Sequence, residues 1–121
     1  MNQSNKESNE TKETLTEIKR TTSFLSKKFP GIMESFYQSF TKIDDEGALS
    51  KKTKRLISLG GALIKGCTYC IAYYVNKCLE AGATPDEILE ASMVALKMNG
   101  GPGLMYITLV LKALRDLGKI E

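Results

Sequence analysis

The sequence holds two cysteines, Cys67 and Cys70, at a spacing that supports thiol–disulfide chemistry. Gly66 ends one apolar helical pattern and the stretch CTYCIAYYVNKCLEAG begins the next, which predicts Cys67 at or near a helix N-cap and Cys70 in the first turn. Unpaired N–H groups and the positive end of the helix dipole favour a thiolate there. Residues three apart share a helix face, close enough for a disulfide after modest adjustment. The pair thus offers a nucleophile and a resolving thiol one turn apart.

Two other interpretations of the pair stay open beside redox chemistry. A metal site usually needs four ligands, and the chain adds only Cys78 and no histidine. Cys78 lies about 12 Å along the helix axis from Cys70, beyond disulfide reach, and its position beside Leu79 predicts a buried core thiol. An inert pair of small residues in a packed helix is the second alternative. A dithiol at a helix N-terminus in a cytosolic chain favours redox chemistry.

The composition excludes several classes of function. The net charge of +3 is small and scattered, so we expect no nucleic-acid partner. No apolar run is long enough to span a bilayer, and the polar start MNQSNKESNETKET is no secretory signal. Three cysteines without an export signal favour the reducing cytoplasm. Without histidine, catalysis must use Cys, Tyr, Lys, Arg or carboxylates, and we expect neither a metal nor a cofactor.

Helical periodicity organises the chain from Leu15 onwards, and no segment alternates with period two. Residues 1–13 have the composition of a polar flexible tail, and residues 14–121 are expected to form a single domain. The sequence therefore predicts an all-α fold, a compact bundle of about five or six helices. Glycine, proline and acidic turns separate the helices, at Phe29-Pro30-Gly31, Asp44 to Gly47, Gly66, Gly82 and Gly100 to Gly103.

The helix before the cysteines begins near Lys51, after the N-cap Ser50, and its inward side is predicted to carry Leu56, Ile57, Leu59, Leu63 and Ile64. Gly60 and Gly61 in its middle cost about 1 kcal/mol each relative to alanine. They imply that another helix or a neighbouring subunit comes very close.

Three further segments complete the predicted bundle. An aromatic stripe over residues 32–40 is typical of a core or a subunit interface. Thr84, Pro85 and Glu87 predict a capped helix start. The last helix, from about Leu104 to Leu117, is apolar on most sides and is expected to be central or part of an interface.

The stretch from Gly47 to Leu117 resembles the carboxymuconolactone decarboxylase family. Several features occur in register, namely the GALS turn, KTK followed by LI, GC-x-YCI, EAGAT-x-x-EI and the GGP break. The CxxC resembles that of the alkyl hydroperoxidase D-like branch. The resemblance implies an all-helical, alkyl hydroperoxidase D-like fold and a homo-oligomer, either a trimer or a hexamer.

The resemblance also implies which residues form the site. In the peroxidase branch, a Glu twelve residues before the first cysteine and a His four residues after the second relay protons to the thiols. Cys67 and Cys70 match the family cysteines, but Arg55 stands at the Glu position and Tyr74 at the His position. Tyr69 falls where some members have another His. The dithiol is therefore retained, while the acid–base relay is replaced.

A replacement mechanism follows if these two residues lie near the thiols. The Arg55 charge would favour a thiolate, and Tyr74 would donate a hydrogen bond to a sulfenate or a leaving thiolate. The alternatives are a solvated Arg55 in the basic run that starts at Lys51, and a Tyr74 that only packs in the core. Helix position favours Cys67 as the first nucleophile, whereas the family relay acts on the second cysteine.

The sequence thus predicts a CxxC-dependent thiol–disulfide oxidoreductase. Its expected partner is a small peroxide, in an antioxidant, peroxiredoxin-like activity, or a disulfide-bearing redox protein. A non-catalytic helical oligomer with an interaction or ligand-binding role is the alternative. Lactone decarboxylation is the less favoured family activity, because that branch generally lacks the CxxC and relies on acid–base residues.

Overall fold

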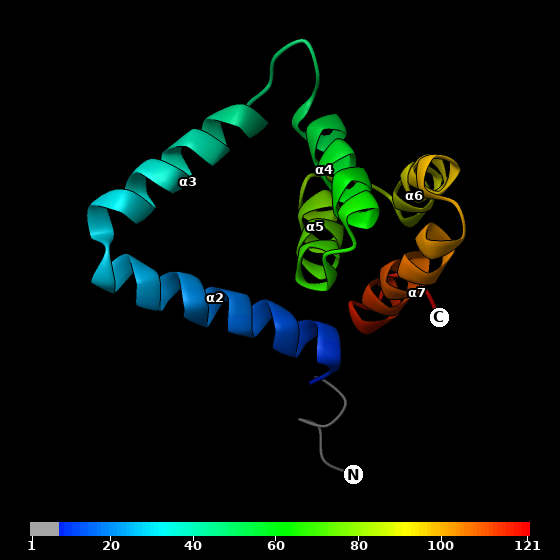
Figure 1. Cartoon of the computed structure of the whole chain (residues 1–121), viewed down its shortest axis with the longest axis horizontal. Helices are drawn as coiled ribbons and strands as arrows, with labels where there is room; N and C mark the ends of the chain where they lie inside the picture. The colour runs from blue at the N-terminus through cyan, green and yellow to red at the C-terminus, as the bar shows by residue number, and fades with distance from the viewer. Residues whose placement is uncertain (1–7) are drawn as a thin grey trace.

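Residues 8–121, which the computed structural model describes, fold into six helices without a strand (Figure 1). This confirms the predicted all-α class and the number of helices. The helices are α2 (Glu10–Lys28), α3 (Pro30–Asp44), α4 (Lys51–Lys65), α5 (Thr68–Glu80), α6 (Pro85–Asn99) and α7 (Gly101–Asp116).

Capping residues in the sequence fix where the helices of the body begin. The Ser50 hydroxyl accepts the N–H of Thr53 at the start of α4. Thr84 and Glu87 form a reciprocal capping box at the start of α6, and Pro85 occupies the first turn. Each cap satisfies N–H groups that have no partner within the helix, so the predicted boundaries of α4 and α6 are confirmed.

The hydrophobic core lies among α4, α5, α6 and α7, which form the body of the molecule. α4 packs on α5 and α6, and α7 packs against the same two helices. Each helix turns one apolar face inward, as expected for a bundle. The largest fully buried apolar side chains are Leu59, Leu63, Ile71, Val75, Cys78, Ile88, Val110 and Leu114.

The inward face of α4 is narrower than the sequence predicts. Leu59 and Leu63 are buried, but Ile57 and Ile64 are 59% and 49% exposed, so their predicted inward position is wrong. A Cβ added to Gly60 or Gly61 would meet no atom within 4 Å. Among residues 8–121, no other helix therefore approaches these glycines, and the predicted close contact with another helix of the chain is not found there.

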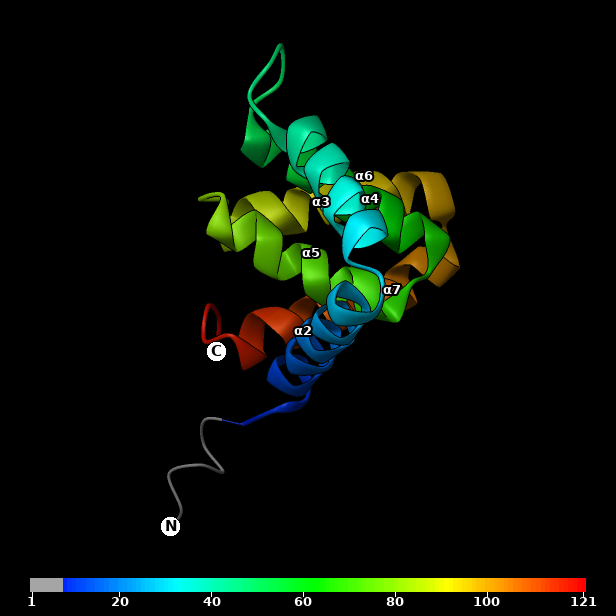
Figure 2. The ribbon, with the colours of Figure 1, turned by 90° about the vertical axis from the view of Figure 1, so that its left-hand side faces the viewer.

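α2 and α3 form an arm that leaves the body and returns to it as two sides of an open triangle (Figure 1). Figure 2 shows this arm from its outer side. α3 has no buried residue over its whole length. Its stripe of large apolar side chains, Ile32, Phe36, Phe40 and Ile43, lies exposed.

Polar contacts fasten both ends of the arm to the body. At the start of α2, the Thr11 hydroxyl donates to the Asp116 carboxylate at 2.7 Å, and the Asn9 amide donates to the Asp116 carbonyl at 2.8 Å. At the end of α3, the Lys54 ammonium donates to the carbonyls of Ile43 and Asp45, at 2.8 and 2.6 Å. The arm is thus held at its ends by hydrogen bonds rather than by an apolar core.

Two helices begin earlier than the sequence predicts. α2 starts at Glu10, within the segment predicted as a tail, because Asn9 caps it and Thr11 is anchored to the body. Residues 1–7 of that predicted tail lie outside the described residues, and the domain boundary at residue 14 stays a prediction. α7 starts at Gly101 rather than Leu104, because proline in a first turn needs no N–H partner.

The position of Leu59 at the centre of the core gives a first testable prediction. Leu59→Ala should lower the free energy of unfolding by about 3 kcal/mol, because it removes a fully buried side chain and leaves a cavity. Urea denaturation followed by circular dichroism measures this. The matched control is Met93→Ala, an exposed apolar position that should change it by less than about 1 kcal/mol. Equal losses in both variants would contradict the assigned core.

Candidate active site

The turn between α4 and α5 sets the position of the cysteine pair. Gly66 adopts a left-handed conformation with φ +71°, and its N–H bonds back to the carbonyl of Ala62. A Cβ at this position would lie 2.8 Å from the Tyr106 hydroxyl oxygen. Both the backbone angle and the tyrosine ring therefore favour glycine, and the chain reverses directly into α5.

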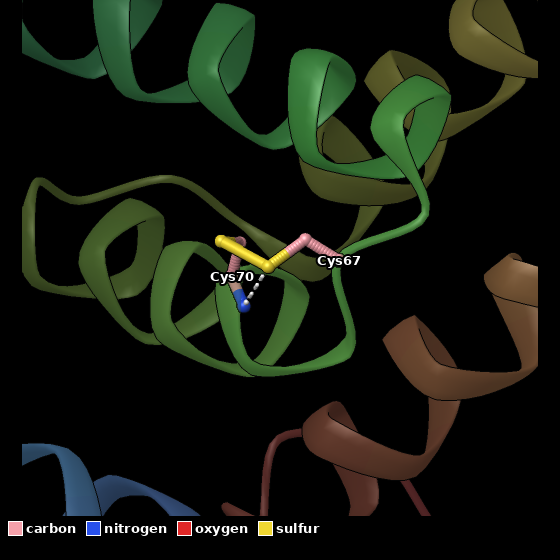
Figure 3. The surroundings of a disulfide bond; sticks show 2 residues. All are labelled: Cys67 and Cys70. Atoms are coloured by element: carbon pink, nitrogen blue, oxygen red, sulfur yellow. Dashed lines mark hydrogen bonds between the residues drawn. A yellow bond between two sulfur atoms is a disulfide. The ribbon is translucent and has the colours of Figure 1, made fainter.

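Cys67 is the N-cap of α5, and Cys70 lies in the first turn, as the sequence predicts. The Cys67 sulfur accepts the backbone N–H of Cys70 at a distance of 3.3 Å. The two residues are joined by a disulfide, with 5.2 Å between their Cα atoms (Figure 3). Both are partly exposed at the surface of the body. The site thus combines a sulfur that caps the helix, a second sulfur in bonding position and access for a reactant.

Thr68 and Tyr69, the residues between the cysteines, line a cavity of about 210 Å³. The start of α2 and the side of α7 line the rest of it, and Lys112 and Glu10 among its lining residues form an ion pair at 3.4 Å. Tyr69 itself is exposed. The structure thus places the predicted site residue Tyr69 in the wall of this cavity, on the same turn as both sulfurs.

Arg55 lies in a partly buried ion pair rather than in solvent. Its Nε is 3.5 Å from a carboxylate oxygen of Asp44, and its Nη1 donates to the carbonyl of Lys77 at 3.0 Å. The Arg55 side chain is 15% exposed and that of Asp44 27%. Because Lys77 is seven residues after Cys70, the carbonyl contact lies about 10 Å farther along α5. Arg55 therefore faces the far half of α5, and no described contact joins it to the sulfurs.

Tyr74 lies between Cys70 and Lys77 in α5, one turn after Cys70 and on the same side of the helix. It packs against the core, and its ring meets the Tyr73 ring edge-on with centroids 5.1 Å apart. Burial raises the pKa of the phenol, and Tyr73 and Asp44 raise it further, while Ser58 and Arg55 act in the opposite direction. Tyr74 is therefore both a packing residue and a phenol that keeps its proton.

Sequence reasoning missed Asp44. The acidic run that starts there was interpreted only as a turn, because acidic residues are common in turns. Arg55 lies eleven positions after Asp44, across the end of α3 and a loop, so no helical spacing pairs the two. The only sequence signal was the match of Arg55 to the family's Glu position, because an arginine held there near the thiols and out of solvent requires a counter-charge.

Two absences hold for the described part of the chain. Within residues 8–121, no three His, Cys, Asp or Glu side chains gather as a candidate metal site. Over the same residues, no helix combines the length and apolar character needed to cross a bilayer.

Comparison with known proteins identifies the family of this chain. The model of the carboxymuconolactone decarboxylase family matches residues 30–113, which is more than half of the chain. The chain belongs to the carboxymuconolactone decarboxylase family. The cysteine pair at disulfide distance is consistent with the CxxC-containing branch of this family. The expected family resemblance is therefore confirmed.

Solved structures of family members share the fold. A carboxymuconolactone decarboxylase family protein from Legionella pneumophila, in its apo form, superposes with a TM-score of 0.86 and 32% identity over 93% of this chain and 100% of its own. A family member from Thermotoga maritima, suggested to take part in an antioxidative response, gives a TM-score of 0.73 and 25% identity, over 84% of this chain and 87% of its own.

Sequence relatives in two bacteria have no established function. An uncharacterised protein of Cupriavidus necator is 33% identical over 92 residues, 76% of this chain and 81% of its own. An uncharacterised protein of the cox locus of Paracoccus denitrificans is 37% identical over 76 residues, 63% of this chain and 66% of its own.

The third cysteine provides a prediction for this site. Cys78 is fully buried, and burial raises the pKa of its thiol to about 12, although Arg55 opposes the shift. Iodoacetamide at pH 8 should therefore label Cys67 and Cys70 in the reduced, folded protein and leave Cys78 unmodified until the chain is unfolded. Mass spectrometry of the digested protein measures this. Labelling of Cys78 in the folded protein at the rate of the other two would refute its burial.

Proposed function

We propose that the protein is a CxxC-dependent thiol–disulfide oxidoreductase that reduces a small peroxide or a disulfide-bearing partner. The observation that carries this proposal is the cysteine pair at the start of α5. Cys67 caps the helix through its sulfur, and Cys70 lies one turn away at bonding distance. Hydrogen bonding from the Cys70 N–H and the helix dipole both stabilise negative charge on the Cys67 sulfur.

The proposed cycle with a peroxide has two steps. The Cys67 thiolate attacks one peroxide oxygen, the O–O bond breaks, and a proton from solvent neutralises the departing alkoxide, so that a sulfenic acid and an alcohol form. The Cys70 thiol then attacks the sulfenic sulfur, which releases water and leaves the disulfide. An external dithiol reduces this disulfide by exchange and restores both thiols. Because that donor must be available in the reduced form, we place the protein in the cytoplasm.

Oxidation with mild peroxide tests the dithiol directly. The reduced wild-type protein should lose two hydrogen atoms, and a dithiol reductant should restore its mass. Cys67→Ser should abolish peroxide consumption, whereas Cys70→Ser should halt at a sulfenic acid that dimedone traps. Cys78→Ser is the matched control and should behave like the wild type. Failure of the wild type to form the disulfide, together with ordinary thiol pKa values near 8.5, would favour the non-catalytic alternative.

The same proposal includes assembly into a homo-oligomer, a trimer or a hexamer. Support comes from α3, a helix of fifteen residues without a buried side chain, and isolated helices of that length are marginal in water. Phe36 and Phe40 stack on each other at 4.2 Å between centroids and remain exposed. The open face at Gly60 and Gly61 offers a surface that a helix of a second copy can approach closely.

Replacing Phe36 and Phe40 by serine should remove the apolar contact between copies. The wild type should sediment as a trimer or hexamer at micromolar concentration, and the double variant as smaller species. Gln38→Ser, on another side of α3, is the control and should sediment like the wild type. A monomeric wild type would contradict the proposed assembly, and an unchanged double variant would exclude this stripe from the interface.

A further inference from the structure

We propose that Tyr106 is a positioning residue of the dithiol site, which supports the Gly66 turn from α7 and thereby keeps Cys67 at the N-cap of α5. The inference rests on the proposed oxidoreductase function, and it adds a residue that lies outside the cysteine motif. It concerns the reduced protein above all, because the bond between the two sulfurs no longer fixes Cys67 there.

The contact between Tyr106 and the turn is direct. A Cβ built on Gly66 would lie 2.8 Å from the phenol oxygen, 2.9 Å from Cζ and 3.1 Å from Cε2 of the tyrosine. The edge of the ring therefore covers the α-carbon of Gly66, the residue directly before Cys67. Because packed side chains leave little free volume, the ring limits how far the turn can move toward α7.

The packing of α7 directs the ring toward the turn. Gly103 is buried, and a Cβ added there would lie 3.2 Å from the Asn99 side chain and 3.4 Å from the α-carbon of Leu96 on α6. Tyr106 comes three positions after Gly103 and four before the fully buried Val110, so the three share one side of α7. Tyr106 itself is partly buried and packs against the core. The close approach of α7 to α6 therefore fixes the side from which the ring reaches the turn.

Hydrogen bonds tie the turn to its own two helices. The N–H groups of Gly66 and Cys67 both bond to the carbonyl of Ala62 in α4, at 2.9 and 3.2 Å. On the α5 side, the N–H of Cys70 donates to the Cys67 sulfur. The Tyr106 ring adds a contact from a third helix, and it does so at a left-handed glycine, the residue type with the greatest backbone freedom.

This support matters once the disulfide is reduced. The bond from the Cys70 N–H to sulfur is weak, so Cys67 stays at the N-cap only while the turn keeps its shape. A Cys67 thiolate that leaves the cap loses both this bond and the favourable end of the helix dipole. It also moves away from Cys70, which slows the attack of the Cys70 thiol on a Cys67 sulfenic acid, the step that forms the S–S bond and releases water.

Tyr106→Leu tests this role, because it keeps an apolar side chain but removes the ring that covers Gly66. In a reduced Cys70→Ser background, alkylation of Cys67 by iodoacetamide at neutral pH should slow about threefold or more, and the midpoint of its pH profile should rise. With both cysteines present, disulfide closure after mild peroxide should slow as well. Tyr106→Phe keeps the ring and should restore both rates.

Leu89→Ala is the matched control for lost stability. Leu89 is also partly buried against the core, but it belongs to α6 and not to the turn or α7. Urea denaturation should show a less stable protein, while alkylation of Cys67 should keep the wild-type rate. A slowing of Cys67 in this control equal to that in Tyr106→Leu would overturn the inference, because general loosening of the core would then explain both.

A double-mutant cycle with Gly66→Ala tests the contact itself. In the wild type, the added methyl group meets both the left-handed backbone and the tyrosine ring. In a Tyr106→Leu background the ring is gone, so Gly66→Ala should shift the urea midpoint by less than it does in the wild type. Shifts that simply add would show that the ring does not press on the turn, and would overturn the inference.

Unchanged rates of Cys67 alkylation and disulfide closure in Tyr106→Leu would also overturn it, even if that variant is less stable. The proposed function fails in a different way. A wild type that consumes no peroxide and exchanges with no disulfide refutes the oxidoreductase, whereas slower alkylation of Cys67 in Tyr106→Leu would still support the positioning role of Tyr106.

Discussion

The reversal of the chain at Gly66 is the constraint on which the site depends. The left-handed residue lets α4 end and α5 begin within two residues, so that the two helices pack side by side and share the core. It also places Cys67 outside the helix, where its side chain can cap the first turn. The α4–α5 turn thus fixes both how these two helices pack and where on the body the cysteine pair lies.

Two kinds of force hold the molecule together in different regions. The body is an apolar core in which each helix buries one face, and its interior polar group Ser92 bonds back to the carbonyl of Ile88 in its own helix. The arm has no such core. Hydrogen bonds and ion pairs hold it to the body at the start of α2 and at the end of α3. The dithiol belongs to the body, whereas Asp44, the ion-pair partner of Arg55, belongs to the arm.

The sequence predicted the features that depend on local chemistry. Helix class, the caps at Ser50 and Thr84, the N-cap position of Cys67 and the burial of Cys78 all follow from residue type and spacing, and the structure confirms them. Exposure of Ile57 could not be predicted, because periodicity shows that a helix is apolar but not how much of its surface one chain covers.

The pairing of Arg55 with Asp44 escaped prediction for a different reason. It joins the end of one helix to the side of another across a loop, and only the path of that loop determines the contact. A resemblance that assigns residues by position in the motif fixes where Arg55 lies along α4. It cannot supply a partner that the motif does not include.

The bonds from Asn9 and Thr11 to Asp116 have a consequence for connectivity. They bring the first described helix turn beside the last one, so the path from α2 to α7 is nearly a closed ring in space. A short linker between these ends, with new termini in the exposed loop at residues 45–49, would keep every helix and the α4–α5 turn intact. The order in which the helices are synthesised can thus be changed without moving the cysteines relative to each other.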